Sequence, residues 1–204
     1  ASLVLTEGDK PGTYRLRLAS RPSATVTVTA VADPADVVVD PATVVFPPGG
    51  WNKWQAVSVD VTNDDVARGT RAGTIHHTVA SDDAKYDGLA VDDVALTLSD
   101  DDTAGVTVSP LAVHVTEGGA TADYQVSLRS APSAAVDIHI TTDGETAVSP
   151  AHLTFGPTTW EQPRVVTVMA VDDGAQEGTH LGTIDHSAQS ADPMYDEIGI
   201  PSVT

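Results

Sequence analysis

The chain has 204 residues, of which 29 are acidic and 10 are basic, giving a formal net charge of −19. This balance argues against a nucleic-acid partner, and the absence of cysteine excludes disulfides, Cys-ligated zinc and thiol nucleophiles. No run reaches the ~18 apolar residues of a membrane span, and the N-terminus lacks the charged and apolar regions of a signal peptide. We therefore expect a mature soluble segment, such as could be cut from a longer protein.

Alternating apolar and polar residues run through the chain and predict strands. In chain order the clearest segments are 24–31, 55–61, 94–98, 135–140 and 164–171, all rich in Val, Thr and Ile. Turn-forming sequences such as "EGDKPGT", "FPPGGW" and "DDGAQEG" separate them. No long window has a convincing helical period. The pattern predicts an all-β protein, in which antiparallel strands form immunoglobulin-like sandwiches of about seven strands.

The chain consists of two copies of one unit. Thr6-Glu7-Gly8 matches Thr116-Glu117-Gly118 at an offset of 117 − 7 = 110 residues, and after one deletion the offset is 109. Matched pairs include Trp51/Trp160, His77/His186 and Tyr86/Tyr195. A period of this length is that of a complete domain with its own core. We predict two tandem sandwiches, residues 1–102 and 103–204, joined in "SDDDTAG" at 99–105.

An acidic stretch, "AVDDGAQEGTH" at 170–180, places Asp172, Asp173 and Glu177 close together with no lysine or arginine among them. Two carboxylates ~4 Å apart repel by about 4 kcal/mol at an effective dielectric constant of ~20. Such a group binds a cation, takes up protons or stays apart in water. The stretch therefore indicates either a calcium site or a solvated acidic loop.

The order of motifs resembles the Calx-β family and its bacterial tandem relatives. It is carried by "VTVSPLAVHVTEGG", "VVTVMAVDD", "EGTHLGTIDH" and, closing the first copy, "LSDDD", and it covers nearly the whole chain. The resemblance implies immunoglobulin-like sandwiches with calcium held at one end by carboxylates from several loops. It also implies repeated modules in large secreted or cell-surface bacterial proteins, with neighbouring repeats and cell-surface or matrix ligands as partners.

Candidate calcium ligands follow from the repeat register and the resemblance. In the second copy we expect them all at one end of the sandwich: Glu117, Asp143, Asp172, Asp173 and Glu177. In the first copy the matching residues are Glu7, Asp33 and Asp64, followed by the run Asp100, Asp101 and Asp102. This run could serve the first copy, the second, or both. Calcium suits such groups because it takes 6–8 oxygen ligands from loops.

The two copies differ in ways that affect these sites. Arg68 occupies the position of Glu177, so we expect calcium binding in the first copy to be weak or lost, with the guanidinium paired to Asp64, Asp65 or the Asp100–Asp102 run as an internal counter-charge. The alternative is an exposed loop arginine. The second copy stops before a counterpart of "LTLSDDD", so we expect it to lack part of its last strand and the aspartates after it.

Other functions have weaker support. His180, His186 and Asp185 suggest zinc, but two strand residues six apart lie ~20 Å apart, too far for one ion. Tyr86 and Tyr195 favour loop anchors over sugar-stacking groups. No catalytic motif is present, and we expect no enzyme. The sequence thus leaves two classes: a calcium-binding structural, spacer or adhesion-associated segment of an extracellular protein, or a carbohydrate- or surface-ligand-binding accessory module of a secreted enzyme, using Trp54, Tyr86 or Tyr195.

Overall fold

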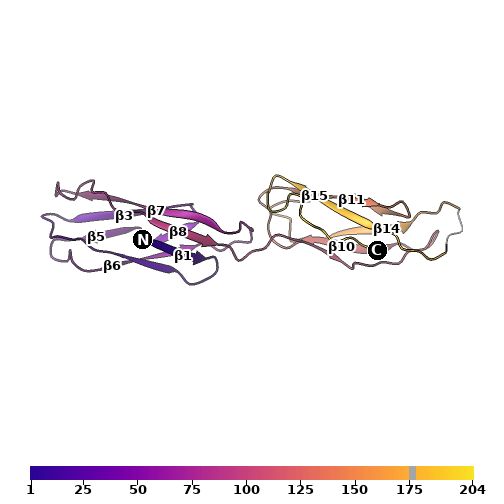
Figure 1. Cartoon of the computed structure of the whole chain (residues 1–204), viewed down its shortest axis with the longest axis horizontal. Helices are drawn as coiled ribbons and strands as arrows, with labels where there is room; N and C mark the ends of the chain where they lie inside the picture. Colours follow the sequence, from indigo (N-terminus) through magenta and orange to yellow (C-terminus); the bar gives the residue numbers. More distant parts are fainter. Residues whose placement is uncertain (175–177) are drawn as a thin grey trace. The chain divides into compact units, whose positions relative to one another are not determined.

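The computed structural model describes residues 1–174 and 178–204. The chain forms two compact units, each built of β-strands (Figure 1). Unit 1 contains residues 1–64 and 68–101, and unit 2 contains residues 65–67 and 102–204. Among the described residues there is no helix long and apolar enough to cross a membrane.

Unit 1 is a sandwich of a five-stranded and a three-stranded sheet. Its strands are β1 (Ser2–Thr6), β2 (Gly12–Leu16), β3 (Val26–Asp33), β4 (Val37–Asp40), β5 (Thr43–Phe46), β6 (Gln55–Val61), β7 (Arg71–Ser81) and β8 (Val94–Ser99). The larger sheet has the order β1-β8-β7-β3-β5 and the smaller β2-β6-β4. All pairs are antiparallel except β1 with β8, which run parallel.

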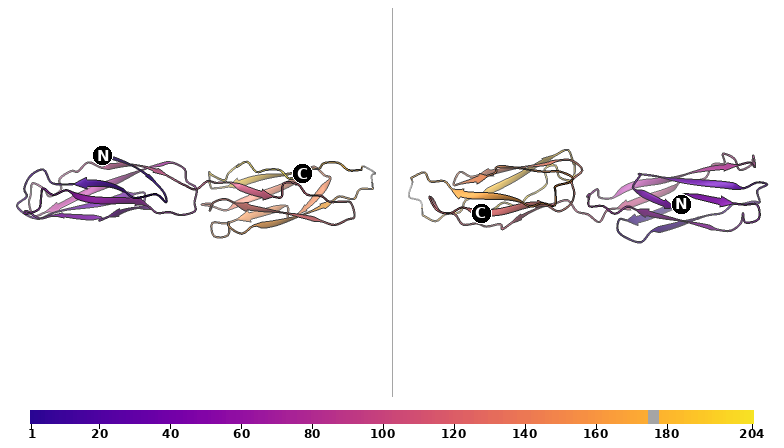
Figure 2. Two further views of the ribbon diagram at one scale, coloured as in Figure 1. Left: turned by 90° about the horizontal axis from the view of Figure 1, so that it is seen from below. Right: turned by 180° about the vertical axis from the view of Figure 1, so that it is seen from behind.

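Unit 2 repeats this architecture with a different distribution of edge strands. Its strands are β9 (Val106–Ser109), β10 (Ala122–Leu128), β11 (Val136–Thr142), β12 (Thr146–Ser149), β13 (His152–Phe155), β14 (Arg164–Ala170) and β15 (Ile184–Ser190). They form the sheets β12-β14-β10-β9 and β13-β11-β15. Two further views show two layers of strands in each unit (Figure 2). The predicted all-β, immunoglobulin-like fold is confirmed.

The register of the two units agrees strand by strand. The central pairs β3·β7 and β11·β15 correspond, as do β2·β6 and β10·β14. In unit 1, Ile75 pairs with Val94 at the start of β8. In unit 2, Ile184 forms an isolated bridge with Val203, which is the same pair shifted by 109 residues. The offset of the repeat is therefore also a structural register.

Each unit buries its own apolar core, as the two-residue period predicts. In β3, Val26, Val28 and Ala30 are buried while the residues between them are only partly covered. Phe46 and Phe155 are fully buried at matching positions, and valine, leucine and isoleucine fill most of the remaining space. Burial of one such side chain contributes about 1.5–3 kcal/mol, so alternate positions on several strands suffice to define a core.

Two tyrosines tie loops to the cores. The Tyr86 hydroxyl donates a hydrogen bond of 2.6 Å to the Ser20 carbonyl, and the Tyr195 hydroxyl donates one of 2.7 Å to the Ser130 carbonyl. Both rings are buried. The prediction that they anchor loops is confirmed. Of the three aromatic residues considered for ligand binding, Trp54 is the exposed one, and the Arg17 guanidinium lies 4.5 Å from its ring centroid.

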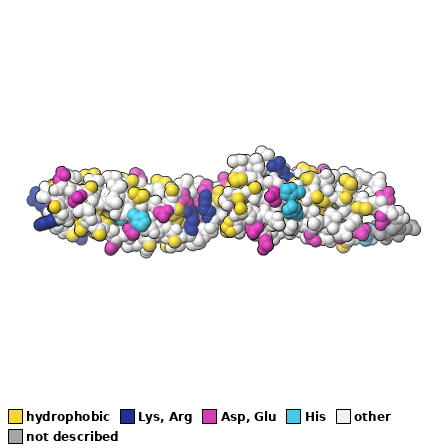
Figure 3. Space-filling model, turned by 90° about the horizontal axis from the view of Figure 1, so that it is seen from above, with side chains coloured by type: hydrophobic (Ala, Val, Ile, Leu, Met, Phe, Trp, Pro, Cys, Tyr) yellow, Lys and Arg dark blue, Asp and Glu magenta, His cyan; other side chains and the backbone are white. Residues whose placement is uncertain are grey.

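The surface carries the charge that composition requires. On the face shown in Figure 3, Asp and Glu side chains occur over both units, and apolar side chains appear in small scattered groups. On this face the apolar groups are the kind of isolated exposure that soluble domains normally show.

Candidate metal centre

Glu7 is the buried member of an acidic group in unit 1. It follows β1 directly, and its backbone N–H donates a hydrogen bond of 2.9 Å to the carbonyl of Ser99, the last residue of β8. The parallel pairing of these two strands thus fixes where the glutamate enters the unit. Its side chain is only 2% exposed. A carboxylate so deeply buried requires compensation, because a buried charge without a partner is costly.

One oxygen of Glu7 has a partner and the other has none. Oε1 accepts a hydrogen bond of 2.5 Å from the backbone N–H of Asp64, whereas Oε2 is buried without a hydrogen-bond partner. Burial raises the pKa of the Glu7 carboxyl, the bond from Asp64 N–H opposes this rise, and the charges of Asp64 and Asp100 add to it. The unpartnered oxygen is therefore a position at which a cation would be stabilising.

Two aspartates that follow β8 lie close to Glu7. Glu7, Asp100 and Asp101 each offer a carboxylate oxygen within 4.8 Å of the others. Gly8 has a left-handed φ of 72°, and a Cβ there would lie 2.8 Å from Asn63 Oδ1 and 3.0 Å from Asp101 Oδ2. Glycine at this turn therefore lets side-chain oxygens from two other loops approach the backbone at Gly8, next to Glu7.

Arg68 lies beside this group and is paired. Its Nη1 and Nη2 each lie 2.8 Å from an oxygen of Asp64, a bidentate ion pair about one-third exposed. Its backbone N–H donates to Asp100 Oδ2. The hydrogen bond to Asp64 raises the pKa of the guanidinium, so Arg68 keeps its charge. The predicted pairing of Arg68 with Asp64 is confirmed, and it uses both oxygens of that aspartate.

A second arginine pair supports the same end of unit 1. Arg71, the first residue of β7, binds both oxygens of Asp36, one at 3.1 Å. This contact lowers the pKa of the Asp36 carboxyl, chiefly through the hydrogen bond from Arg71. Each of the two arginine side chains thus forms a bidentate pair with an aspartate, Arg68 with Asp64 and Arg71 with Asp36.

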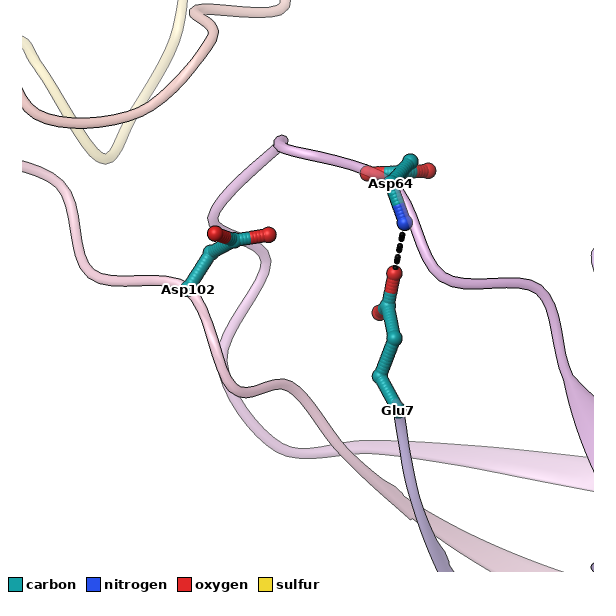
Figure 4. Close-up of side chains that lie close together, drawn as sticks. All are labelled: Glu7, Asp64 and Asp102. Atoms are coloured by element: carbon teal, nitrogen blue, oxygen red, sulfur yellow. Dashed lines mark hydrogen bonds between the residues drawn. The ribbon is translucent and has the colours of Figure 1, made fainter. Parts of the chain in front are cut away.

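Two predicted ligands of the first copy are not counted in this centre. Asp33 is an exposed residue at the end of β3 and is not one of the grouped carboxylates. Asp102 is the first residue of the longer segment of unit 2 and is therefore not part of the unit 1 centre. Figure 4 labels it together with Glu7 and Asp64 and marks the hydrogen bond between the latter two.

The candidate residues of unit 2 are more dispersed among the described residues. Glu117, Asp172 and Asp173 are exposed. Asp143 is engaged locally, since Oδ2 accepts 2.6 Å from Thr183 N–H and Oδ1 accepts 3.2 Å from Glu145 N–H. Glu177 lies outside the described residues. Within residues 1–174 and 178–204, the groups of three ligand atoms found within 4.8 Å of one another all include Glu7, so the unit 2 site stays a prediction.

His180 is paired with a glutamate. Its Nε2 lies 2.9 Å from Glu145 Oε2, at the position that Arg71 and Asp36 occupy in unit 1. His186 is used differently, because its Nε2 is hydrogen-bonded to the Tyr124 hydroxyl at 3.0 Å. Each histidine thus has its own partner, in agreement with the distance argument against a shared zinc ion.

The sequence did not show which unit would hold the buried carboxylate. Reasoning from charge favoured unit 2, because Arg68 enters the acidic loop of unit 1. The charges along the sequence do not show that Asp64 binds the guanidinium with both oxygens, or that Asn63 lies close to Gly8. The available signal was the Glu-Gly pair directly after a strand, since a left-handed glycine turns the chain at the end of the sheet.

The donor set fits calcium. Carboxylate and amide oxygens are the ligands of a hard cation, and oxygens 2.3–2.6 Å from one ion lie at most about 5 Å apart. The 4.8 Å limit that encloses the oxygens of Glu7, Asp100 and Asp101 meets this condition. Glu7 Oε2, buried and without a hydrogen-bond partner, adds a ligand atom whose desolvation the ion would offset.

These features define a tandem pair of immunoglobulin-like β-sandwiches with an acidic centre in unit 1.

No protein-family model matches the chain, and no curated protein matches it. Three solved structures resemble it as follows. The calcium binding domain CBD12 of CALX1.1 is 16% identical, with 91% of this chain and 77% of that chain covered and a TM-score of 0.39. CBD12 from CALX1.2 is 17% identical, with 94% and 79% covered and a TM-score of 0.38. The Pseudomonas aeruginosa CupB2 chaperone is 9% identical, with 92% and 95% covered and a TM-score of 0.39.

Proposed function

We propose that this chain is a non-enzymatic, calcium-binding tandem β-sandwich module, serving as a structural, spacer or adhesion-associated segment of a large bacterial secreted or cell-surface protein. The observation that carries the proposal is the buried, unpartnered Oε2 of Glu7 beside Asp100 and Asp101. Glu7, Asp100 and Asp101 would hold the ion, with Asn63 Oδ1 nearby.

Calcium would act on stability. Without a cation, carboxylate oxygens no more than 4.8 Å apart repel by at least roughly 3 kcal/mol per pair at an effective dielectric constant of ~20. An ion bound by the end of β1 and the residues after β8 replaces this repulsion by attraction. Because it binds the folded unit only, it stabilises that unit by about 2.7 kcal/mol at a calcium concentration 100-fold above its Kd. Such a gain in stability is what an extracellular module under mechanical tension requires.

Calorimetric titration of the full chain with calcium tests the proposal, together with thermal denaturation in calcium and in chelator. We expect saturable binding and a higher Tm in calcium. Glu7→Gln keeps an acceptor for Asp64 N–H but removes the charge, so it should lose most of both effects. Asp101→Asn, at an exposed position, should weaken binding without a risk to folding.

Glu161→Gln is the matched control, because Glu161 is an exposed glutamate in the turn before β14 and outside the group. It should bind calcium as the unchanged chain does. Identical melting curves in calcium and in chelator would overturn the proposal. A glycan array run in parallel covers the alternative function: a hit that Trp54→Ala abolishes would favour a carbohydrate-binding module.

A further inference from the structure

A pair of histidines lies on the outer face of the three-stranded sheet of unit 2. His139 on β11 and His152 on β13 are directly opposite each other in the antiparallel pairing of these strands. Both side chains are exposed, and their ring centroids lie 4.8 Å apart. Opposite residues of an antiparallel pair have Cβ atoms about 4.5–5.5 Å apart, so the strand pairing itself keeps the two imidazoles together.

The spacing of the two rings suits a shared metal ion. An ion about 2.0–2.1 Å from one nitrogen of each imidazole lies roughly 3.2 Å from each ring centre, which puts the two ring centres of a tetrahedral site about 5 Å apart. The observed 4.8 Å agrees with this value. Two aromatic rings in simple contact can have the same spacing. The groups around the pair are therefore needed to distinguish a metal site from a stacked pair.

Asp137 holds one of the two rings in the way that metal-binding histidines are held. It lies on the same face of β11 as His139, and its Oδ1 lies 3.3 Å from His152 Nε2. Thr154 Oγ1 donates a hydrogen bond of 2.7 Å to the same oxygen, which fixes the carboxylate. Metal-binding histidines almost always donate their second ring N–H to a carboxylate, a carbonyl or water. With Nε2–H directed at Asp137, the lone pair of His152 lies on Nδ1, where a metal ion can accept it.

The matching positions of unit 1 carry a different set of side chains. Thr29 and Thr43 are paired there, at the register of the two histidines. Thr27 and Val45, paired in the same ladder, take the places of the carboxylate and of the hydroxyl that supports it. The strand pairing therefore does not require histidine, since unit 1 forms it with threonine. The histidines, the carboxylate and the hydroxyl are a set that unit 2 has and the same ladder of unit 1 lacks.

We infer that His139 and His152 bind one divalent transition-metal ion of the zinc and copper class through their imidazole nitrogens, with Asp137 as a positioning residue and water as the remaining ligands. Imidazole suits these ions, whereas calcium takes oxygen ligands. The site thus differs in chemistry from the carboxylate group around Glu7. Because β13 is an edge strand and β11 is the central strand of its sheet, the bound ion ties the edge to the sheet.

Calorimetric titration of the untagged full chain with Zn²⁺ in excess calcium tests the inference, because calcium occupies carboxylate sites and does not compete for imidazole. We expect one ion per chain, NMR shifts at the rings of His139 and His152, and a higher Tm in Zn²⁺. With Cu²⁺, the EPR spectrum should show two nitrogen ligands. His139→Thr and His152→Thr introduce the residues that unit 1 carries, so each should fold and lose most of the binding.

His76→Thr serves as the control, because His76 is also an exposed histidine beside a carboxylate, Asp93, but faces Val31 across its strand pair. This variant should bind Zn²⁺ as the unchanged chain does. Asp137→Ala should weaken Zn²⁺ binding about tenfold. Asp137→Asn keeps an acceptor for His152 and should recover most of the affinity. In both Asp137 variants the copper EPR spectrum should keep two nitrogen ligands.

Three results would overturn the inference. Unchanged Zn²⁺ affinity in both threonine variants would show that the ion binds elsewhere. No binding by the unchanged chain would show that the two rings are only in contact. Zinc-dependent dimerisation in analytical ultracentrifugation would place the ligands on two molecules. Each of these results leaves the calcium proposal to its own titration, since that proposal depends on the oxygen ligands of unit 1.

Discussion

The Tyr14 hydroxyl and His77 Nε2 form a hydrogen bond of 2.9 Å across the two sheets of unit 1. Tyr124 and His186 repeat it at 3.0 Å in unit 2. His186 Nδ1 lies 3.0 Å from the Pro201 carbonyl, which only accepts, so Nδ1 carries the proton and Nε2 accepts from tyrosine. Burial lowers the pKa of both histidines and raises the pKa of both tyrosines to about 12. The pair is therefore neutral in the folded protein.

Mild acid should destabilise the protein through these histidines. The unfolded chain binds a proton near pH 6.5, whereas the folded pKa of His186 is lower. The stability that neutral His186 contributes is therefore fully present above about pH 6.5, and it is lost as the pH falls toward the pKa of His186 in the folded protein. Urea denaturation at pH 7.5 and pH 5.5 should give a lower free energy of unfolding at pH 5.5.

His186→Gln supplies the comparison, since glutamine also accepts from the Tyr124 hydroxyl and does not titrate. Its loss between the two pH values should be smaller than that of the unchanged chain. The raised pKa of Glu7 acts with the opposite sign in both proteins, so it cancels in the difference. Equal losses in the two proteins would contradict the assignment.

Tyr195→Phe should reduce the stability of unit 2 by about 1–3 kcal/mol, because a buried N–H loses its acceptor. Ser130 N–H donates 3.1 Å to the Tyr195 hydroxyl, and Ser130 is fully buried. Tyr86→Phe is the matched variant in unit 1. Ser20 is exposed, so water can replace the hydroxyl there and the loss should be smaller. Thermal denaturation of both variants measures the difference, and a larger loss for Tyr86→Phe would be inconsistent with this account.

Arg68→Glu restores in unit 1 the glutamate that unit 2 has at position 177. The variant loses the bidentate pair with Asp64 and adds a fifth carboxylate to Glu7, Asp64, Asp100 and Asp101, so it should melt lower in chelator. In calcium it should bind about tenfold more tightly, or about 1.4 kcal/mol. Arg68→Gln, which removes the charge without adding one, should lie between. Unchanged affinity in both variants would show that Arg68 has no influence on the ion.

The Asp36–Arg71 pair should contribute about 1 kcal/mol, since its side chains are only 21–24% exposed and the contact is bidentate. A double-mutant cycle with Asp36→Asn and Arg71→Gln measures the coupling. It should weaken in 1 M salt, where the Debye length falls to about 3 Å. A coupling near zero at low salt would show that the pair only fills space.

Much of the architecture was predictable from sequence because it depends on local chemistry. The two-residue period in "ATVTVTAV" gives β3 its buried face, and the repeat offset of 109 reappears as the Ile75–Val94 and Ile184–Val203 pairs. Loop anchoring by Tyr86 and Tyr195 also followed from their equivalent positions. Such features follow from sequence because solvation alternates with each residue along a half-buried strand.

The candidate site depended on the tertiary structure. Charge alone directed attention to Asp172 and Asp173, which are exposed, whereas Glu7 became buried only because β1 pairs with β8 and brings the end of one strand to the start of an acidic run ninety-three residues later (100 − 7 = 93). Arg68 was expected to weaken or abolish calcium binding in the first copy, and only the structure showed that its guanidinium pairs with both oxygens of Asp64. Composition and period therefore determined the strands and their cores, since these depend on neighbours in sequence. The pairing of β1 with β8, far apart in sequence, decided that Glu7 is the carboxylate removed from water. The sequence could not show this, because a side chain is buried by the assembled sheets and not by its own segment.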